Sequence, residues 1–390
     1  MVEAKVLERQ RAVQRFHNGE RVATICRSLK RSREWLYKWV HRAEGTATDA
    51  WATDDARRPK RSPTQLDAGT IATILTTRQS LAAQGVFCGA QAIAWELEDL
   101  GVSRLPSLRT INRVLARHDG GTGRARRYVP KGRPYPALPA DRPGARHQTD
   151  FVGPCYLHGP IRFYSLHSVD LATGRCAVAP VMSRSSQVTI DALWAMWQRL
   201  GFPQHQQVDN DMVFYGSRAH PRGMGPLIRL CLTHGIEPWF IPPAEPWRNG
   251  VVEKFNDRWQ QQGPLRQPLG SFAALRRASL AFEQRHNGAY RYSKLGGKTP
   301  DAALAASGIR LRFPPSQAAP RHPLPKPDRG RYHVIRFIRH NRQLDVFGET
   351  FRVPSVAAYT YVRATIDVAA QRLIVYLDGQ AIDEHAYRLR

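Results

Sequence analysis

Three carboxylates in the middle of the chain are the residues best placed to do chemistry. Asp150 lies within a predicted strand, Asp209 ends a second short strand, and Glu253 lies on the helix that follows residues 246–250. An unpaired buried charge is costly, so acids on strands seldom face a core without partners. If the two strands are parallel neighbours, Asp150 and Asp209 can share a hard cation such as Mg²⁺, and Glu253 can complete a second site.

A pair of Mg²⁺ ions bound in this way would serve phosphodiester chemistry. The two ions would clamp the attacking and the leaving oxygen of an in-line displacement, with no covalent enzyme intermediate. Spacing alone is a weak signal, because the chain of 390 residues holds 32 acidic residues. The alternative is that the three acids pair with some of the 58 lysines and arginines.

The elements that must position these acids have the order of an α/β fold. The central block of the chain mixes strands rich in β-branched residues with amphipathic helices. We predict antiparallel strands at 148–152, 163–170 and 176–181, a helix at 185–200, a short strand at 206–209, a helix at 226–234, a strand at 236–241 and a helix from 249 onward.

Shifts in composition divide the whole chain into blocks and linkers. Two helical blocks come first and are joined by a polar stretch with the basic run 57–61. Short alternating apolar segments make up the last block. The predicted boundaries are 1–45 and 62–119 for the helical domains, 120–144 for a basic Gly/Pro linker, 145–307 for the mixed block, 308–329 for a Pro-rich linker and 330–390 for the C-terminal block.

The composition favours a nucleic-acid partner. The formal net charge is +26, and a polyanion is the partner that such a charge attracts most strongly. A hydrophobic content of 42% is too high for a disordered chain. No apolar run is long enough to cross a bilayer and the N-terminus lacks the apolar stretch of a signal peptide, so we expect no membrane partner. Five scattered cysteines favour the reducing cytoplasm.

The first block has the pattern of a helix-turn-helix. Apolar residues at spacings of three and four predict a helix over 22–29, and Ser32 is the expected N-cap of the next helix. Arg31, Arg33 and Lys38 lie at outward positions of that helix and suit contacts with DNA. The alternative is a helical hairpin with a solvated basic face.

The second block repeats this pattern. A helical face over 90–97 is broken at Gly101, and a second helix opens from 106. Arg109 and Arg113 lie on this second helix as candidate DNA ligands. We expect a second, winged-helix-like helix-turn-helix domain, so that the protein reads a long DNA site.

The C-terminal block alternates apolar and basic residues and ends its segments at turns such as Asp378-Gly379. This pattern predicts a small, five-stranded SH3-like barrel. A purely structural cap is the alternative to a DNA-binding role. The candidate DNA contacts of this block are Arg336, Arg339, Arg342 and Arg363.

Segments of the mixed block carry a resemblance to a known family. His-Gln-Thr-Asp-Phe at 147–151, Val-Asp-Asn-Asp at 208–211, and Pro-Ala-Glu-Pro-Trp-Arg-Asn-Gly followed by Val-Val-Glu-Lys-Phe-Asn at 243–256 occur in this order. They are followed by His-Asn at 286–287 and Leu-Gly-Gly-Lys-Thr-Pro at 295–300. The block resembles the retroviral-integrase-like core of DDE transposases, especially those of bacterial insertion sequences. The helix-turn-helix units match such transposases, and the last block resembles the β-barrel found in relatives of the Mu transposase.

The resemblance implies a fold, a metal and a reaction. It implies an RNase H-like core with a mixed five-stranded sheet, and it puts the catalytic, metal-binding triad on Asp150, Asp209 and Glu253. It implies Mg²⁺ or Mn²⁺ as cofactor, two ions being expected, and hydrolytic nicking followed by strand transfer. The partners would be double-stranded DNA, both terminal inverted repeats and target, bound by a homodimer or a larger assembly.

The sequence departs from the family pattern at three places. His147 replaces the usual tryptophan, and Asp211 replaces the usual glycine and adds a like charge near the metals. The interval between Asp209 and Glu253 is longer than usual, and we assign the excess to a loop at 215–224. Asp211 is the reason to keep a second reading, a transposase-derived DNA-binding protein with an inactive core. A plain metal-dependent nuclease is the third.

Polar residues around the third acid have open roles. Arg248 and Lys254 suit phosphate contacts, with solvated surface charge as the alternative. Asn249 is either a DNA contact or the cap of the helix that carries Glu253. Asp170, next to a predicted turn, is expected to be structural.

Overall fold

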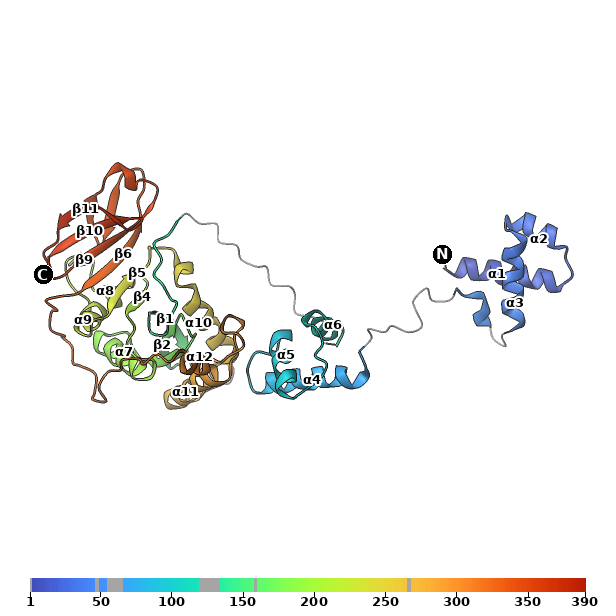
Figure 1. Cartoon of the computed structure of the whole chain (residues 1–390), viewed down its shortest axis with the longest axis horizontal. Helices are drawn as coiled ribbons and strands as arrows, with labels where there is room; N and C mark the ends of the chain where they lie inside the picture. Colours follow the sequence, from blue (N-terminus) through green and yellow to red (C-terminus); the bar gives the residue numbers. More distant parts are fainter. Residues whose placement is uncertain (1, 46–48, 55–65, 119–133, 158–159, 265–267) are drawn as a thin grey trace. The chain divides into compact units, whose positions relative to one another are not determined.

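The computed structural model describes residues 2–45, 49–54, 66–118, 134–157, 160–264 and 268–390. The chain forms two compact units, Met1–Ala68 and Gly69–Arg390 (Figure 1). The basic run 57–61 and most of the predicted linker 120–144 lie outside the described residues.

The first unit is a three-helix domain with its own core. Ser32 accepts a hydrogen bond from the backbone N–H of Trp35 at 3.1 Å, and Lys30 takes a left-handed conformation with φ 53° that ends the preceding helix. The predicted helix-turn-helix is therefore confirmed in its helices and its turn. The elements are α1 (Val2–His17), α2 (Val22–Leu29), α3 (Arg33–Glu44) and the 3₁₀ helix η1 (Asp49–Ala52).

The second unit opens with three more helices. Ile93, Ile111 and Leu115 are buried between them, as the apolar spacing requires. Residues 66–118 contain no strand, so the wing that the sequence analysis expected is not found in the described part of this block. The helices are α4 (Ala68–Ala83), α5 (Ala90–Asp99) and α6 (Leu108–His118).

A nine-stranded sheet organises the rest of the second unit, in the order β11-β10-β9-β6-β5-β4-β1-β2-β3. Its core half is a mixed sheet of five strands, in which β1, β2 and β3 form an antiparallel meander and β4 and β5 run parallel to β1. The predicted mixed sheet is confirmed, but its five core strands are continued by four more in one nine-stranded sheet. The strands are β1 (Arg146–Tyr156), β2 (Arg162–Asp170), β3 (Cys176–Val181), β4 (His205–Val208) and β5 (Glu237–Phe240).

Helices cover both faces of this sheet because successive strand residues point to opposite sides. On β2, Leu166 packs into the core shared with α7 and α9, whereas Phe163 and Val169 pack against α10 and α11. The helices are α7 (Ser186–Leu200), α8 (Met212–Tyr215), α9 (Pro226–Thr233), η2 (Pro246–Asn249), α10 (Gly250–Gln262), α11 (Phe272–Ala289), η4 (Ser293–Leu295) and α12 (Pro300–Ser307).

The C-terminal block does not form a separate five-stranded barrel. Its first strand, β6, pairs parallel with β5 through Trp239–His333 and Phe240–Val334, and three further strands continue the core sheet while β7 and β8 form a hairpin. The alternating pattern predicted strands correctly, but pairing with an open sheet edge is a long-range choice that alternation does not encode. The elements are β6 (Arg331–Phe337), β7 (Gln343–Val346), β8 (Glu349–Arg352), η5 (Ser355–Ala357), β9 (Tyr361–Asp367), β10 (Arg372–Leu377) and β11 (Gln380–Ala386).

The Pro-rich stretch between the core and these strands lies along the core. Residues 309–330 contain no helix or strand, yet the Trp194 indole donates to the carbonyl of Gln317 at 3.0 Å and the N–H of Phe202 donates to the carbonyl of Arg312 at 2.7 Å. All five cysteines are free thiols. None of the helices in the described ranges is long and apolar enough to span a membrane.

Candidate active site

Asp150 and Asp209 come together through the parallel pairing of β1 and β4. The register runs through Gln148–Gln207, and each aspartate lies two residues further along its own strand direction. Burial raises the pKa of Asp150 to about 7, and the nearby negative charges of Asp209 and Glu253 add to the rise. The three acids are therefore electrostatic neighbours.

Glu253 is held by the way α10 starts. The Gln148 side-chain oxygen accepts hydrogen bonds from the first N–H groups of the helix, those of Val251 and Val252, each at 3.1 Å. The amide groups of Gln148 and Gln207 both donate to the carbonyl of Arg248, at 3.2 and 2.9 Å. Two glutamines from the paired strands thus satisfy backbone groups around the start of α10 and fix its first turn, which carries Glu253, over the sheet.

The electrostatics of the three carboxylates favour a cation. Burial also raises the pKa of Asp209, to which the Asp211 charge adds while the Asp211 N–H opposes the rise. Burial raises the pKa of Glu253 too, with contributions from Asp257 and Asp209. Oxygen ligands that repel one another in a poorly solvated site suit a hard divalent ion. Within the described ranges, however, no three His, Cys, Asp or Glu side chains lie close enough together to form a ready-made metal group.

A buried series of hydrogen bonds lies behind Asp150 and was not predicted from the sequence. Asn256 donates to the Asp150 carboxylate at 2.8 Å, and its own oxygen contacts Nδ1 of His167 at 2.7 Å. Burial lowers the pKa of His167 to about 4, so its ring is neutral at neutral pH, and its Nε2 contacts the Ser165 hydroxyl at 2.8 Å. Asn256 lies three residues after Glu253, and that helical spacing was the available signal.

The Asp211 side chain has a structural role at the start of α8. Its carboxylate accepts a hydrogen bond from the N–H of Val213 at 3.1 Å, caps the short helix α8 and forms an ion pair with Arg184. Its own N–H donates to Asp209 at 3.1 Å. The Asp211 side chain therefore starts a helix and pairs with Arg184, although its charge raises the pKa of Asp209.

Asn249 is not available to DNA, which corrects one of its two predicted roles. Its side chain is 2% exposed, donates to the carbonyl of Thr149 at 3.2 Å and accepts from Gln207 at 3.1 Å. It makes no capping hydrogen bond to α10 either. Asn249 belongs to the buried network that joins α10 to the sheet.

The two basic neighbours of the third acid differ. Arg248 is partly buried, forms an ion pair with Glu245 at 3.0 Å and lies 3.9 Å above the ring of Tyr135. Lys254 is exposed. Of the two, Lys254 is the one with a freely accessible charge for a phosphate contact.

The predicted DNA ligands of the helical domains all lie on the surface. Arg31, Arg33 and Lys38 on or beside α3 are exposed, as are Arg109 and Arg113 on α6. Arg31 forms an ion pair with Glu8 at 3.0 Å, which DNA would have to compete with or share. Their DNA contacts remain predictions.

Asp170 is a structural acid, as expected. It accepts hydrogen bonds from the N–H groups of Gly144 and Thr173, at 2.7 and 2.8 Å. Burial opposes its charge, but the nearby ring of His147 and the hydrogen bonds from Thr173 outweigh burial and hold the pKa of Asp170 at about 2. His147, the residue in place of tryptophan, is fully buried beside it.

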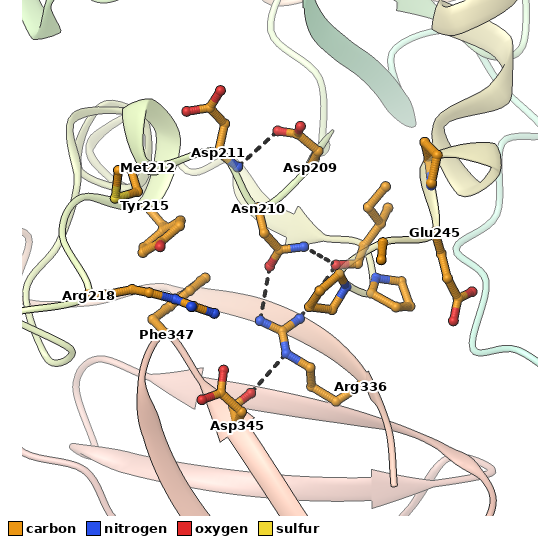
Figure 2. A pocket seen from close by; sticks show the side chains of 15 residues that line it. Asp209, Asn210, Asp211, Met212, Tyr215, Arg218, Glu245, Arg336, Asp345 and Phe347 are labelled. Atoms are coloured by element: carbon orange, nitrogen blue, oxygen red, sulfur yellow. Dashed lines mark hydrogen bonds between the residues drawn. The ribbon is translucent and has the colours of Figure 1, made fainter. Parts of the chain in front are cut away.

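A cavity of about 680 Å³ opens beside Asp209 (Figure 2). Its walls come from the loop after β4, from residues 241–246 after β5, and from β6 and β7. Four acids, Asp209, Asp211, Glu245 and Asp345, and two arginines, Arg218 and Arg336, line it. Two of these acids are already paired with arginines outside the lining, Asp211 with Arg184 and Glu245 with Arg248. Asp150 and Glu253 do not line it.

Comparisons with known proteins agree with parts of this description. Residues 3–50 match the family model of the homeodomain-like domain, which confirms the N-terminal helix-turn-helix. No curated protein matches the chain.

Several solved structures are similar to the chain. Two are the integrase catalytic core domain of HTLV-2 in complex with magnesium, in trimeric and dimeric forms, each 20% identical over 42% of this chain and 97% of the other, with TM-scores of 0.32 and 0.31. A third belongs to a simian T-cell lymphotropic virus intasome in complex with a PP2A regulatory subunit, 16% identical over 80% of this chain and 97% of the other, with a TM-score of 0.35. Similarity of this degree leaves the reaction to be argued from the site.

Proposed function

We propose that this protein is an insertion-sequence transposase that binds terminal inverted repeats and catalyses metal-dependent DNA nicking and strand transfer. The observation that supports it best is the raised pKa of Asp150, to which burial and the nearby charges of Asp209 and Glu253 contribute. The three acids come from a central strand, the end of its parallel neighbour and a covering helix. Such a set of desolvated carboxylates has little structural value without a cation.

The three acids would hold Mg²⁺ or Mn²⁺, two ions being the simplest complement. Bound there, the ions would activate the attacking oxygen and stabilise the leaving oxygen of a phosphodiester. The chain's own groups prepare this site. Asn256 orients the Asp150 carboxylate, the N–H of Asp211 holds Asp209, and the first turn of α10 aims Glu253.

The helical domains would supply the DNA specificity. We propose that α3 reads base edges while Arg31, Arg33 and Lys38 contact phosphates, and that Arg109 and Arg113 on α6 do the same further along the repeat. Joining two ends of an element requires at least two protomers on the DNA. We propose the cytoplasm as the place of this reaction.

Strand transfer in vitro tests the proposal. The purified chain would be given labelled terminal-repeat DNA, a target plasmid and Mg²⁺ or Mn²⁺, beside the variants Glu253→Gln and Asp191→Asn. Asp191 is an exposed acid on α7 and serves as the matched control. We expect joined product from the wild type and from Asp191→Asn, and none from Glu253→Gln.

Two other outcomes would replace the proposal. Repeat binding without cleavage in either metal would identify a DNA-binding protein with an inactive core, a reading favoured by the lack of a ready-made metal group among the described residues. Cleavage that never yields joined product would identify a nuclease.

A further inference from the structure

We infer that the C-terminal strands position the catalytic carboxylates, through Arg336 on the loop that carries Asp209 and through Tyr361 on the turn that leads to Glu253. The inference rests on the proposed function and assigns this block a task other than binding DNA. Arg336 and Tyr361 act through other residues, so both are positioning residues.

Arg336 on β6 is the first contact. It is 6% exposed, which corrects its predicted role as a surface DNA ligand. Its guanidinium donates to the side-chain oxygen of Asn210 at 2.9 Å and to the carbonyls of Asp345 at 2.8 Å and Ile335 at 2.9 Å, with a longer bond of 3.4 Å to the carbonyl of Ile241 (Figure 2). Asn210 in turn donates to the same Ile241 carbonyl.

These bonds tie together the chain segments around the cavity. Asn210 directly follows Asp209, and Ile241 directly follows β5, so one guanidinium from β6 links the ends of the two parallel core strands. Figure 2 shows Arg336 between Asn210 and Asp345, and it shows Asp209 beside Asn210. A shift of Arg336 would therefore move the backbone that aims Asp209.

Arg336 carries a buried positive charge, which a residue that only fills space does not need. No ion pair joins it to a carboxylate within the described ranges, and burial lowers its pKa to about 10, which still leaves it charged at neutral pH. An apolar side chain would fill the same volume without that desolvation cost. What the guanidinium adds is its set of rigid, directed donors, and these are used on the loop of Asp209.

Tyr361 on β9 is the second contact. Its hydroxyl donates to Glu245 at 2.7 Å, and the other oxygen of Glu245 accepts from Arg248 at 3.0 Å. The carbonyl of Arg248 is the acceptor used by Gln148 and Gln207 at the start of α10. A chain of hydrogen bonds thus connects the C-terminal strands with the helix that carries Glu253.

The loop that lengthens the interval between Asp209 and Glu253 also contacts the C-terminal strands. In the loop at 215–224, Arg222 forms an ion pair with Glu349 on β8 at 2.5 Å, and the Tyr387 hydroxyl donates to the carbonyl of Pro221 at 3.0 Å. At the start of this loop the ring of Tyr215 stacks on Phe347 at 4.4 Å. The extra residues therefore anchor the core to the C-terminal strands.

The test compares Arg336→Met with Arg331→Met in the full chain. Both changes remove one guanidinium from β6, but Arg331 is exposed and pairs with Asp367 at the far end of the strand. The measurements are Mn²⁺ binding without DNA, single-turnover nicking, repeat binding and hydrogen exchange of the amides at 209–215. For Arg336→Met we expect Mn²⁺ binding and nicking to fall roughly 10- to 100-fold, with faster exchange and unchanged repeat binding. Arg331→Met should match the wild type.

A second pair of variants, with a smaller change in the side chain, is used if Arg336→Met does not fold. Tyr361→Phe removes one hydroxyl only, and Tyr376→Phe on β10 is its control. We expect Tyr361→Phe to weaken Mn²⁺ binding and slow nicking at an unchanged melting temperature. The inference is overturned if the folded test variants match their controls in exchange, Mn²⁺ binding and nicking. A wild type that neither binds Mn²⁺ nor nicks DNA overturns the proposed function instead, and the exchange rates then still decide whether Arg336 orders the loop.

Discussion

The N-terminal helix-turn-helix unit and the C-terminal strands obtain their stabilising contacts from different places. In the first, Val13, Ile25 and Trp39 pack in a cluster made of residues of the same unit. In the second, Val334 and Val362 belong to one core together with α7 and α9 on the five-stranded half of the sheet. A region with its own core can fold and function independently of the rest of the chain. A region that shares the core of the sheet can affect the geometry of the candidate active site beside it.

Deleting each region in turn should give the largest effects, and it tests whether one region has its own core and the other shares the core of the sheet. Removal of 1–45 should abolish repeat binding while leaving a folded core that nicks non-specific DNA with Mn²⁺. Removal of 331–390 should abolish nicking and cooperative unfolding, because it exposes the core residues shared with α7 and α9. Calorimetry and a nicking assay on both fragments would check this. A stable, active fragment without 331–390 would contradict the shared core.

A core substitution in the first unit should act on that unit alone. Trp39→Ala removes a side chain that is 2% exposed and should lower the free energy of unfolding of the unit by about 3–5 kcal/mol. Repeat binding should be lost, while nicking of non-specific DNA should not change. Tyr37→Ala, a change at an exposed residue of the same helix, should have a much smaller effect on stability. Calorimetry of the full chain, with both assays, tests whether the units are independent.

The buried Asp150 carboxyl should make the stability of the metal-free protein depend on pH. The Asp150 pKa is about 7 in the folded protein and about 3.8 in the unfolded chain, so between these values the folded state binds more protons. The free energy of unfolding should therefore fall as pH rises from about 4 to about 7. Asp150→Asn should flatten this slope, and Mg²⁺ should offset the loss at pH 7 and above.

Thermal unfolding at a series of pH values, with and without Mg²⁺, gives the measurement. An unchanged slope in Asp150→Asn would mean that the pKa of Asp150 is not raised in the folded protein. The same slope in Asp191→Asn as in the wild type is the expected control result.

The smallest effect should come from single surface arginines. Arg33→Ala on α3 should weaken repeat binding and reduce the slope of log affinity against log salt by about one. Arg339→Ala, an exposed change just after β6, should alter repeat binding less, because we assign the C-terminal strands to the active site. Binding isotherms at several salt concentrations would compare them. A larger effect at Arg339 would return DNA binding to the C-terminal block.

The sequence alone was sufficient where the decisive interactions are local. Ser32 was identified as an N-cap because capping depends on a residue and the three that follow it. The strands and helices of the core followed from periodicity in the same way. The sequence brings Asp150 and Asp209 together only if their strands are parallel neighbours, and the register of β1 and β4 meets that condition.

The tertiary structure decided everything that depends on which distant segments meet. Arg336 has the pattern of an outward basic residue on a strand, and only the pairing of β6 with β5 buries it against Asn210. Asn249 has the pattern of a cap or a DNA contact, and only the pairing of β1 with β4 buries it between the Gln207 side chain and the carbonyl of Thr149. Periodicity records which face of an element is apolar, but not what covers that face, because the partner is chosen by contacts between residues far apart in the chain.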